Sequence, residues 1–173
     1  SDKVSLNTIL TDISEGKIQL PEFQRGWVWD DNHIISLIAS ISMSYPIGAI
    51  MMLETGNKNV RFKSRPIEGV LLPKPIEPEQ YILDGQQRLT SLFQSIFHSQ
   101  AVATRDFKGK EIKRWYYIDM EKSLDDMDRE ETIISVPEDK IIIGFGHDIL
   151  ADYSTKEFEY KNSMFPLNHV YDA

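Results

Sequence analysis

The sequence has 173 residues, 41% of them hydrophobic and 27% charged, which is the composition of one ordinary globular domain with a hydrophobic core. Its 19 basic and 27 acidic residues give a formal net charge of −8, which disfavours a protein that holds duplex DNA mainly through its phosphates. The absence of cysteine excludes disulfides, zinc–thiolate sites, iron–sulfur clusters and cysteine nucleophiles.

The first part of the chain predicts a short helix, a brief strand and a loop. Apolar residues at three- and four-residue spacing over residues 4–13 indicate an amphipathic helix, which Gly16 stops. Residues 18–20 are typical of a strand that ends at Pro21. Residues 22–29 follow neither period and hold two tryptophans, so we expect an ordered loop there.

A second helix and a second strand follow. Asp30 or Asp31 is a suitable N-cap, since a carboxylate accepts hydrogen bonds from the free amides at a helix start. A broad apolar stripe continues to Met43 and predicts a well-buried helix. Residues 49–53 are then expected to form a strand in the core.

The middle of the chain is richer in turns. Residues 61–63 are expected to pair with the preceding strand as a hairpin across the Gly56-Asn57 turn. Prolines mark residues 66–78 as a loop. A short apolar strand is predicted over residues 81–83.

The second half of the chain mixes helix and strand. An Asp-Gly turn leads into a predicted helix over residues 86–99 with a strong apolar face. Residues 115–120 are expected to form a strand, and an acidic segment after it is expected to be solvated. Residues 132–136 and 141–143 are rich in β-branched side chains and predict two strands or one bent strand. The fold class is therefore α+β.

The domain organisation follows from the same pattern. Residues 1–173 contain no repeat and no low-complexity tract, and we expect a single domain. Residues 164–171 are apolar, whereas natural termini are usually polar. We therefore expect the N-terminal part of a longer protein.

Several common sites are not supported. The chain has no P-loop, and its four histidines show no metal-ligand spacing. Gly144-Phe145-Gly146 follows an isoleucine run, but Ile149 occupies the position of the third glycine of a dinucleotide fingerprint. We expect an ordinary turn at the end of a strand there.

Residues 20–29 form the first segment that is able to carry chemistry. Arg25 is a candidate phosphate ligand, because a guanidinium binds two oxygens at once. Trp27 or Trp29 is a candidate for stacking on a base. The alternative is structural: both tryptophans belong to the core, and Arg25 pairs with an acidic neighbour.

Residues 81–90 form the second segment. A strand that enters a helix through a tight turn directs the first helical amides outward, where they favour an anion. Arg88 adds a positive charge, Asp84 is placed to hold a divalent cation, and Gln86 and Gln87 offer neutral donors and acceptors. These groups suit a nucleoside triphosphate with Mg²⁺. The alternative is an ordinary turn followed by good helix formers.

The order and spacing of these segments, together with residues 45–48, resemble the DGQQR-motif family of bacterial domains. Residues 20–25, Trp29 and residues 84–90 carry the resemblance, whose anchored part covers residues 6–97. The family forms the N-terminal domain of GmrSD-type modification-dependent restriction enzymes and related phage-defence proteins. The resemblance implies an α+β fold like that of ParB and sulfiredoxin, a mixed sheet with packed helices.

The resemblance also implies a nucleotide site. The residues that it places at the nucleotide are Gln24, Arg25, Gly85, Gln86, Gln87, Arg88 and Thr90. Asp84, Gln87 and Arg88 are the expected catalytic residues, and Asp84 is the expected Mg²⁺ ligand. Residues 45–48 are expected to be structural.

The implied function is that of a regulatory domain which binds and hydrolyses nucleoside triphosphates. Nucleotide state would be coupled to recognition or cleavage of modified DNA, with a downstream nuclease domain making the cut. DNA is then a partner of the full-length protein. No apolar run spans a bilayer and no targeting segment begins the chain, so we expect a cytoplasmic protein without membrane contact; a homodimer is left open.

Other functions are kept as alternatives. One is a non-catalytic module that senses modified DNA through the tryptophan loop. Others are a metal-dependent DNA phosphodiesterase and an oligomerising scaffold. Arg61, Lys63 and Arg65 form a compact basic cluster, which a solvated hairpin explains at least as well as DNA contact.

Overall fold

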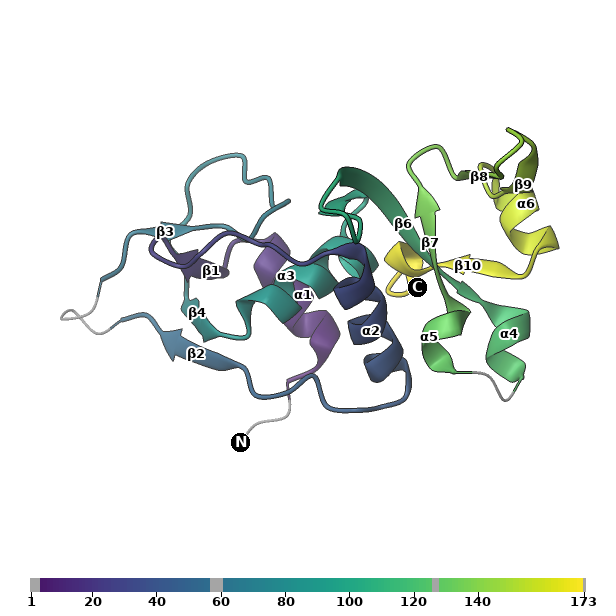
Figure 1. Cartoon of the computed structure of the whole chain (residues 1–173). Coiled ribbons are helices and arrows are strands. Elements are labelled where there is room, and N and C mark those ends of the chain that lie inside the picture. Colours follow the sequence, from purple (N-terminus) through teal and green to yellow (C-terminus); the bar gives the residue numbers. More distant parts are fainter. Residues whose placement is uncertain (1–3, 57–60, 126–127, 173) are drawn as a thin grey trace. The chain divides into compact units, whose positions relative to one another are not determined.

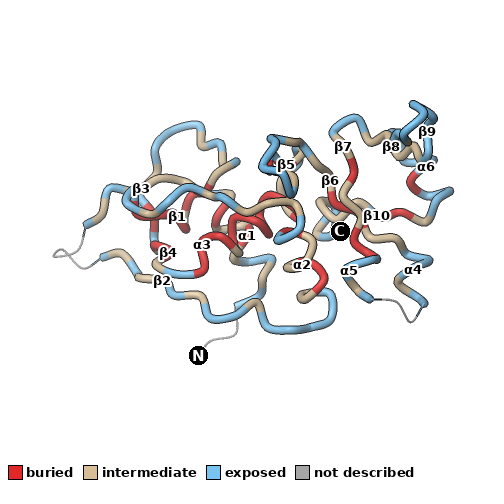
Figure 2. The backbone as a smooth tube through the Cα atoms, viewed as in Figure 1, coloured by how far each residue is buried: buried red, intermediate tan, exposed pale blue. Residues whose placement is uncertain are grey.

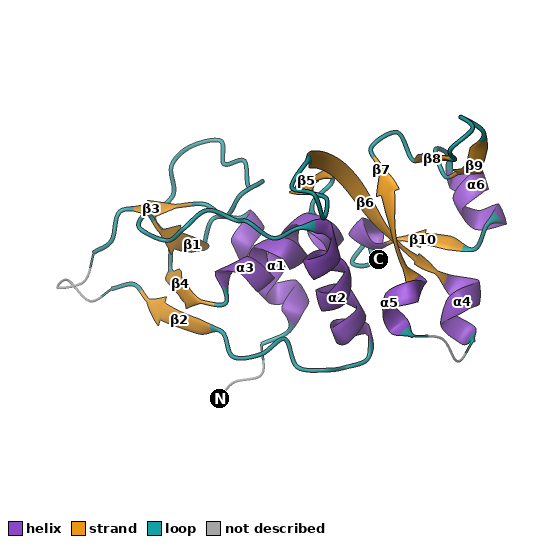
Figure 3. Cartoon of the chain, viewed as in Figure 1, coloured by secondary structure: helices purple, strands orange, loops and turns teal. Residues whose placement is uncertain are grey.

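A computed structural model describes residues 4–56, 61–125 and 128–172 (Figure 1). The chain divides into two compact units, and each is taken by itself below. The first unit comprises Ser1–Val28 and Gly48–Gln94, and the second comprises Trp29–Ile47 and Ser95–Ala173. Helices and strands alternate in both (Figure 3), which confirms the predicted α+β class.

The first unit is a small mixed sheet with two helices. Its elements are α1 (Leu6–Ser14), β1 (Ile18–Pro21), β2 (Met51–Glu54), β3 (Ser64–Arg65), β4 (Gln80–Asp84) and α3 (Gln86–Leu92). The strand order is β2-β4-β1-β3, in which β1 and β4 are parallel and the other pairs are antiparallel. The predicted helix, strand and loop of the N-terminal part are confirmed.

The apolar stripes of the helices and the central strands β1 and β4 form the core of this unit (Figure 2). Burying one such aliphatic side chain contributes about 1.5–3 kcal/mol. The most deeply buried apolar residues are Leu10, Ile13, Ile18, Leu20, Ile67, Tyr81, Ile82, Leu89, Leu92 and Phe93. The core therefore fixes the end of β1 and the start of α3.

Two predictions for this unit are wrong. Strand β2 lies at the edge of the sheet and is half-buried at most, with Met51 59% exposed, so it is not a core strand. Strand β3 pairs with β1, and in the described part of the chain β2 pairs with β4 and not with residues 61–63 as expected. The Asn57 position of that turn lies outside the described residues. Short strands choose partners by tertiary packing, which a local turn signal does not report.

The second unit contains the remaining elements. They are α2 (Asp31–Ser42), β5 (Val102–Arg105), β6 (Glu111–Asp119), α4 (Met120–Leu124), α5 (Arg129–Thr132), β7 (Ile133–Pro137), β8 (Ile141–Ile143), β9 (Ile149–Asp152), α6 (Lys156–Lys161), β10 (Met164–Pro166) and the 3₁₀ turn Leu167–His169. Asp30 is the N-cap of α2, and its carboxylate accepts from the His33 amide.

Strand β6 is the centre of the second unit. It pairs antiparallel with β5, β7 and β10. The hydroxyl of Tyr116 donates to Asp31 (2.7 Å), and the hydroxyl of Ser135 donates to the same oxygen (2.8 Å), so one carboxylate attaches α2 to β6 and β7. Burial, together with the Asp31 carboxylate, raises the pKa of Tyr116 far above its usual range.

The helix predicted over residues 86–99 is shorter and changes form. It is α-helical to Leu92 and then π-helical over Phe93–Phe97. The strand predicted at residues 115–120 is the longer β6, and β7 and β8 are separate strands. The Gly144-Phe145-Gly146 stretch forms the turn of the β8–β9 hairpin, which confirms the predicted ordinary turn.

Short elements were missed in the second unit, namely β5, β9, α6 and β10. The acidic segment is partly helical as α4 and α5, and residues 126–127 lie outside the described ranges. Within those ranges, no helix combines the length and the apolar character needed for a bilayer crossing.

Candidate functional site

Residues 22–28, here called the 22–28 loop, connect directly to the β4–α3 turn through side-chain amides. Nε2 of Gln86 donates to the carbonyl oxygen of Arg25 (2.6 Å), and Nε2 of Gln87 donates to that of Gly26 (3.1 Å). Oε1 of Gln87 accepts from the Val28 amide (3.0 Å). In the opposite direction, Nε2 of Gln24 donates to the carbonyl oxygen of Leu83 in β4 (3.0 Å). The structure thus brings both predicted segments together.

The Trp27 side chain also bonds the 22–28 loop to helix α3. Its indole Nε1 donates to the hydroxyl of Ser91 (2.9 Å), which itself donates to the carbonyl oxygen of Gln87 (2.7 Å). Trp27 is half-buried, and so is Trp29, whose ring lies 5.5 Å from that of His33 between centroids. Neither tryptophan is a fully buried core residue. Trp27 acts in part through its polar nitrogen, which is common for this side chain.

A pair of residues that the sequence interpretation missed holds the loop from another element. Arg65 in β3 donates through Nη1 to Oε1 of Glu68 (3.0 Å) and through Nη2 to the carbonyl oxygens of Gln24 (3.1 Å) and Arg25 (3.2 Å). The same Glu68 oxygen accepts from the Trp27 amide (3.1 Å). Arg65 is therefore an internal support of the 22–28 loop, not a member of a solvated basic cluster.

Residues 45–48, the third segment of the resemblance, end in a glycine that leaves space for the Arg88 side chain. Nη2 of Arg88 donates to the carbonyl oxygen of Ala49 (2.8 Å). Gly48 has φ +93°, and a Cβ at that position would lie 2.0 Å from Nη1 of Arg88. Gly85 has φ +87°, and a Cβ there would lie 3.3 Å from Nη2 of Arg88 and 3.1 Å from Ile50. Two glycines thus border one guanidinium, which agrees with a structural role for Gly48.

The two charged side chains that are freest in this region are Arg25 and Asp84. Both are exposed, and neither has a hydrogen-bond or ion-pair partner among the described residues. Their backbones, in contrast, are fixed, since the carbonyl oxygen of Arg25 accepts from both Gln86 and Arg65. Helix α3 begins after Gly85 without a side-chain cap, so its first amides are not occupied by a capping side chain.

The other predicted site residues occupy different positions. Gln86 and Gln87 are buried, and Oε1 of Gln86 is a buried acceptor without a partner among the described residues. Thr90 is 1% exposed and belongs to the interior face of α3. Arg88 is half-buried. The exposed part of the site therefore consists of Arg25, Asp84 and part of Arg88.

The described residues offer Mg²⁺ one carboxylate at this place. No group of three or more histidine, aspartate and glutamate side chains able to hold a metal occurs among them. This donor set fits a Mg²⁺ ion that arrives with a nucleotide, because Mg²⁺ usually keeps several waters and combines one or two carboxylates with substrate phosphates. It does not fit a metal held by protein side chains alone.

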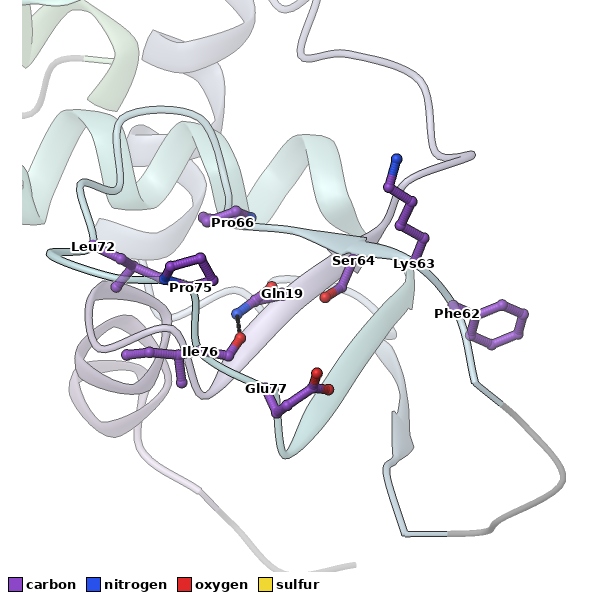
Figure 4. A pocket seen from close by; sticks show the side chains of 9 residues that line it. All are labelled: Gln19, Phe62, Lys63, Ser64, Pro66, Leu72, Pro75, Ile76 and Glu77. Atoms are coloured by element: carbon purple, nitrogen blue, oxygen red, sulfur yellow. Dashed lines mark hydrogen bonds between the residues drawn. The ribbon is translucent and has the colours of Figure 1, made fainter.

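A separate hollow of about 330 Å³ lies beside β3 (Figure 4). Its wall includes Gln19, which is 2% exposed and donates through Nε2 to the carbonyl oxygens of Gly16 (2.9 Å) and Ile76 (2.8 Å). Gln19 thereby fixes the chain near Ile76 to the end of α1. None of the predicted site residues lines this hollow.

Comparison with known proteins identifies the family. The chain matches the family described as GmrSD restriction endonuclease, N-terminal domain, over residues 6–169. It therefore belongs to that family, as the motifs predict, and it is a module of restriction and phage-defence proteins. The match includes residues of both compact units.

A relative is found in Methanocaldococcus jannaschii. It carries the description uncharacterized protein MJ0686 and is 32% identical to this chain over 144 residues. The match covers 80% of this chain and 24% of the relative, so the chain spans about a quarter of the length of this curated protein.

Proposed function

We propose that this chain binds and hydrolyses a nucleoside triphosphate at the junction of the 22–28 loop and the β4–α3 turn. In the restriction system, the nucleotide state would be coupled to recognition or cleavage of modified DNA. The observation that carries this proposal is the contrast within the junction. Its backbone is held by a dense set of hydrogen bonds, while Arg25 and Asp84 remain exposed without partners among the described residues.

A fixed backbone with a free charged side chain suits the binding of phosphates. The support of Arg25 by Gln86 and Arg65 limits where its guanidinium can lie before a ligand arrives. Such preorganisation reduces the entropy lost on binding. Arg88, whose guanidinium is already oriented by Ala49, would provide the second positive charge.

Asp84 would hold Mg²⁺ directly or through water, because it is the exposed carboxylate at the turn. The metal ion would neutralise part of the phosphate charge. In the reaction, a water attacks the γ-phosphorus and the bond to the β-phosphate oxygen breaks, which yields a nucleoside diphosphate and inorganic phosphate. Arg25 and Arg88 would stabilise the charge on the transferred group.

Gln24, Gln86 and Gln87 would act as positioning residues in this scheme. Their amides are bonded to backbone groups of the junction, so they hold Arg25 and the turn in place. Gly85 and Gly48 would keep space for the Arg88 guanidinium. Thr90 would support the turn from the interior of α3.

The test is a thermal-unfolding panel with ATP, GTP, CTP and UTP, each with Mg²⁺, on the wild type and on the Asp84→Ala and Arg25→Ala variants. A nucleotide at a hundred times its Kd adds about 2.7 kcal/mol and raises Tm by roughly 5–10 °C in a chain of this size. Both variants are expected to lose most of this shift. Lys63→Ala is the matched control, because Lys63 is an exposed cation of the same unit, 81% exposed and paired with Glu22.

The outcome of the panel distinguishes the proposed nucleotide site from the alternative functions. A shift in the wild type that is lost in both variants supports the site, and phosphate release is then measured with the same proteins. No shift with any nucleotide at millimolar concentration contradicts the proposal and favours the non-catalytic DNA-sensing module. A shift that survives in both variants contradicts this location.

A further inference from the structure

The hollow beside β3 has the features of a second ligand site (Figure 4). Its volume of about 330 Å³ is enough for a short organic ligand. Its walls come from β1, from the chain around β3 and from the chain over residues 72–77, so it belongs to the first unit alone. None of the residues proposed to hold the nucleotide lines it, and a ligand in the hollow would therefore be independent of the nucleotide site.

Gln19 is the buried polar group of this hollow. It is 2% exposed, and its Nε2 donates to the carbonyl oxygens of Gly16 (2.9 Å) and Ile76 (2.8 Å). An amide nitrogen carries two hydrogens, so both donors are used, and a reversed amide would place its oxygen against two carbonyl oxygens. Oε1 of Gln19 has no hydrogen-bond partner among the described residues and is not fully enclosed. The protein therefore presents a fixed acceptor to the hollow.

The other polar side chains of the lining also favour a ligand that donates. Glu77 is exposed, and its carboxylate has no hydrogen-bond or ion-pair partner among the described residues. Lys63 lines the hollow too, but its ammonium group is bound to Glu22 (3.1 Å) and points away from Gln19 in Figure 4. The hydroxyl of Ser64 is able to accept as well as donate. An anion would meet the Glu77 carboxylate, whereas a cation would find acceptors.

The rest of the wall supplies apolar surface. Leu72 and Ile76 contribute aliphatic side chains, and Pro66 and Pro75 contribute rings on residues that have no backbone N–H. Methylene groups pack against such a surface while a charged end group stays at polar atoms, as the side chains of lysine and arginine do. The hollow thus combines an apolar wall with acceptor oxygens.

We propose that this hollow binds an organic cation with an aliphatic stem, that is, an alkyl ammonium or alkyl guanidinium group. An N–H of the cation would donate to Oε1 of Gln19, and the Glu77 carboxylate would compensate its charge. The stem would lie along Leu72 and the two prolines. Lysine and arginine side chains carry this chemistry, and so do free polyamines.

The experiment follows the isotope-labelled chain by NMR while probes with the same butyl stem are added. The probes are n-butylammonium, n-butylguanidinium, neutral n-butanol and the anion pentanoate. The side-chain amide signals of Gln19 report on the hollow itself, because this amide lines it. Both cations are expected to shift these signals saturably, with a Kd at least about fivefold lower than that of butanol. Pentanoate is expected to leave the signals unchanged.

Two variants test the role of charge. Glu77→Gln keeps the size of an exposed side chain and removes its charge, so it is expected to weaken both cations by about fivefold and to leave butanol binding unchanged. Glu79→Gln is the matched control, because Glu79 is an exposed glutamate of the same segment that does not line the hollow. It should change each Kd by less than about twofold.

Three results would overturn the proposal. One is equal binding of butylammonium and butanol by the wild type, and another is an equal effect of Glu77→Gln and Glu79→Gln on the cations. The third is a set of Gln19 amide signals that stay fixed up to about 50 mM of either cation, because ligands of this size bind in the millimolar range where a site exists.

The source of the cation is decided by a second arm, with spermidine and a blocked pentaglycine that carries one central lysine. Tighter binding of the peptide assigns the hollow to a basic side chain of a partner protein, and tighter binding of spermidine assigns it to a free amine. Either result supports the assigned chemistry. A peptide with norleucine in place of the lysine keeps the stem and lacks the charge, and equal binding of this peptide would contradict it.

Discussion

The 22–28 loop of the first unit and the Lys140–Glu159 pair of the second unit use charge in opposite ways. In the loop, hydrogen bonds hold the backbone, and the Arg25 side chain stays exposed without a partner among the described residues. In the second unit, Lys140 is paired with Glu159, whose carboxylate also accepts from the Tyr117 hydroxyl. The loop offers an unpaired cation on a rigid support, whereas Lys140 and Glu159 pair with each other.

The difference indicates different ligands. An unpaired guanidinium on a fixed backbone suits an anion, since its desolvation is repaid by direct charge pairing. Lys140 and Glu159 are already paired, so an ion that bound to either of them would have to compete with an existing partner. The proposal of a triphosphate for the loop follows from its unpaired guanidinium.

The largest effect is expected from removing the support of the loop. Arg65→Met deletes the hydrogen bonds to Glu68, Gln24 and Arg25, and it leaves a partly buried carboxylate without its cation. We expect the free energy of unfolding to fall by about 3 kcal/mol and the nucleotide-dependent rise in Tm to disappear. Urea unfolding and the thermal panel measure the two effects.

Lys63→Met is the control for this variant, because Lys63 belongs to an exposed ion pair with Glu22 and should change stability by less than about 1 kcal/mol. Similar small losses for both variants would show that the hydrogen bonds of Arg65 do not hold the loop. The contrast between a supported loop with a free cation and the Lys140–Glu159 pair would then fail.

Substitution of Gly48 is expected to lower stability less than Arg65→Met does, and to lower nucleotide affinity clearly. Gly48→Ala places a Cβ 2.0 Å from Nη1 of Arg88 at φ +93°, so Arg88 must move. Gly109 has φ +80° and open space around its Cβ position, so Gly109→Ala reports the backbone strain alone. We expect each variant to lose about 1–2 kcal/mol, measured by urea unfolding. Only Gly48→Ala should lower nucleotide affinity; an equal effect of both on binding would exclude Arg88 from the site.

The smallest effect is expected from a change of salt concentration. Raising NaCl from about 50 mM to about 500 mM shortens the Debye length severalfold and should weaken nucleotide binding at the loop by roughly tenfold. Nucleotide titrations at both salt concentrations test this. An affinity that does not change with salt would contradict phosphate binding through Arg25 and Arg88.

Sequence patterns predicted the strongly periodic and strongly capped elements. Helices α1 and α2 and the strands β1 and β4 follow from apolar spacing, Asp30 and the turn residues. The patterns failed where partner choice decides the structure, as for β3, which pairs with β1, and for the edge strand β2. They also failed for strands of three or four residues such as β9 and β10, whose length gives no readable period.

The motifs predicted which segments meet, but not how each side chain is used. The placement of Gln86 and Gln87 at a nucleotide stays a prediction, and the structure adds that their amides bond to the 22–28 loop. Arg65 was assigned to a basic cluster and Glu68 carried no signal, because their contacts to residues 24–27 lie about 40 positions away and leave no mark in local spacing. Glu159 was missed for the same reason, since its partner Tyr117 is distant in sequence.

The side-chain amide of Gln87 contacts the 22–28 loop in the way a neighbouring strand would, with Nε2 on one peptide oxygen and Oε1 on a nearby peptide N–H. Glutamine supplies both atoms, whereas glutamate lacks the donor and methionine lacks both. Gln86, Gln87 and Arg65 all hold peptide groups of the loop, and the loop side chains that add hydrogen bonds to the fold are those of Gln24 and Trp27, not those at positions 25 and 28. The residues at positions 25 and 28 can therefore change during evolution or engineering, and the chemistry presented by the loop can be exchanged while its attachment to the fold is retained.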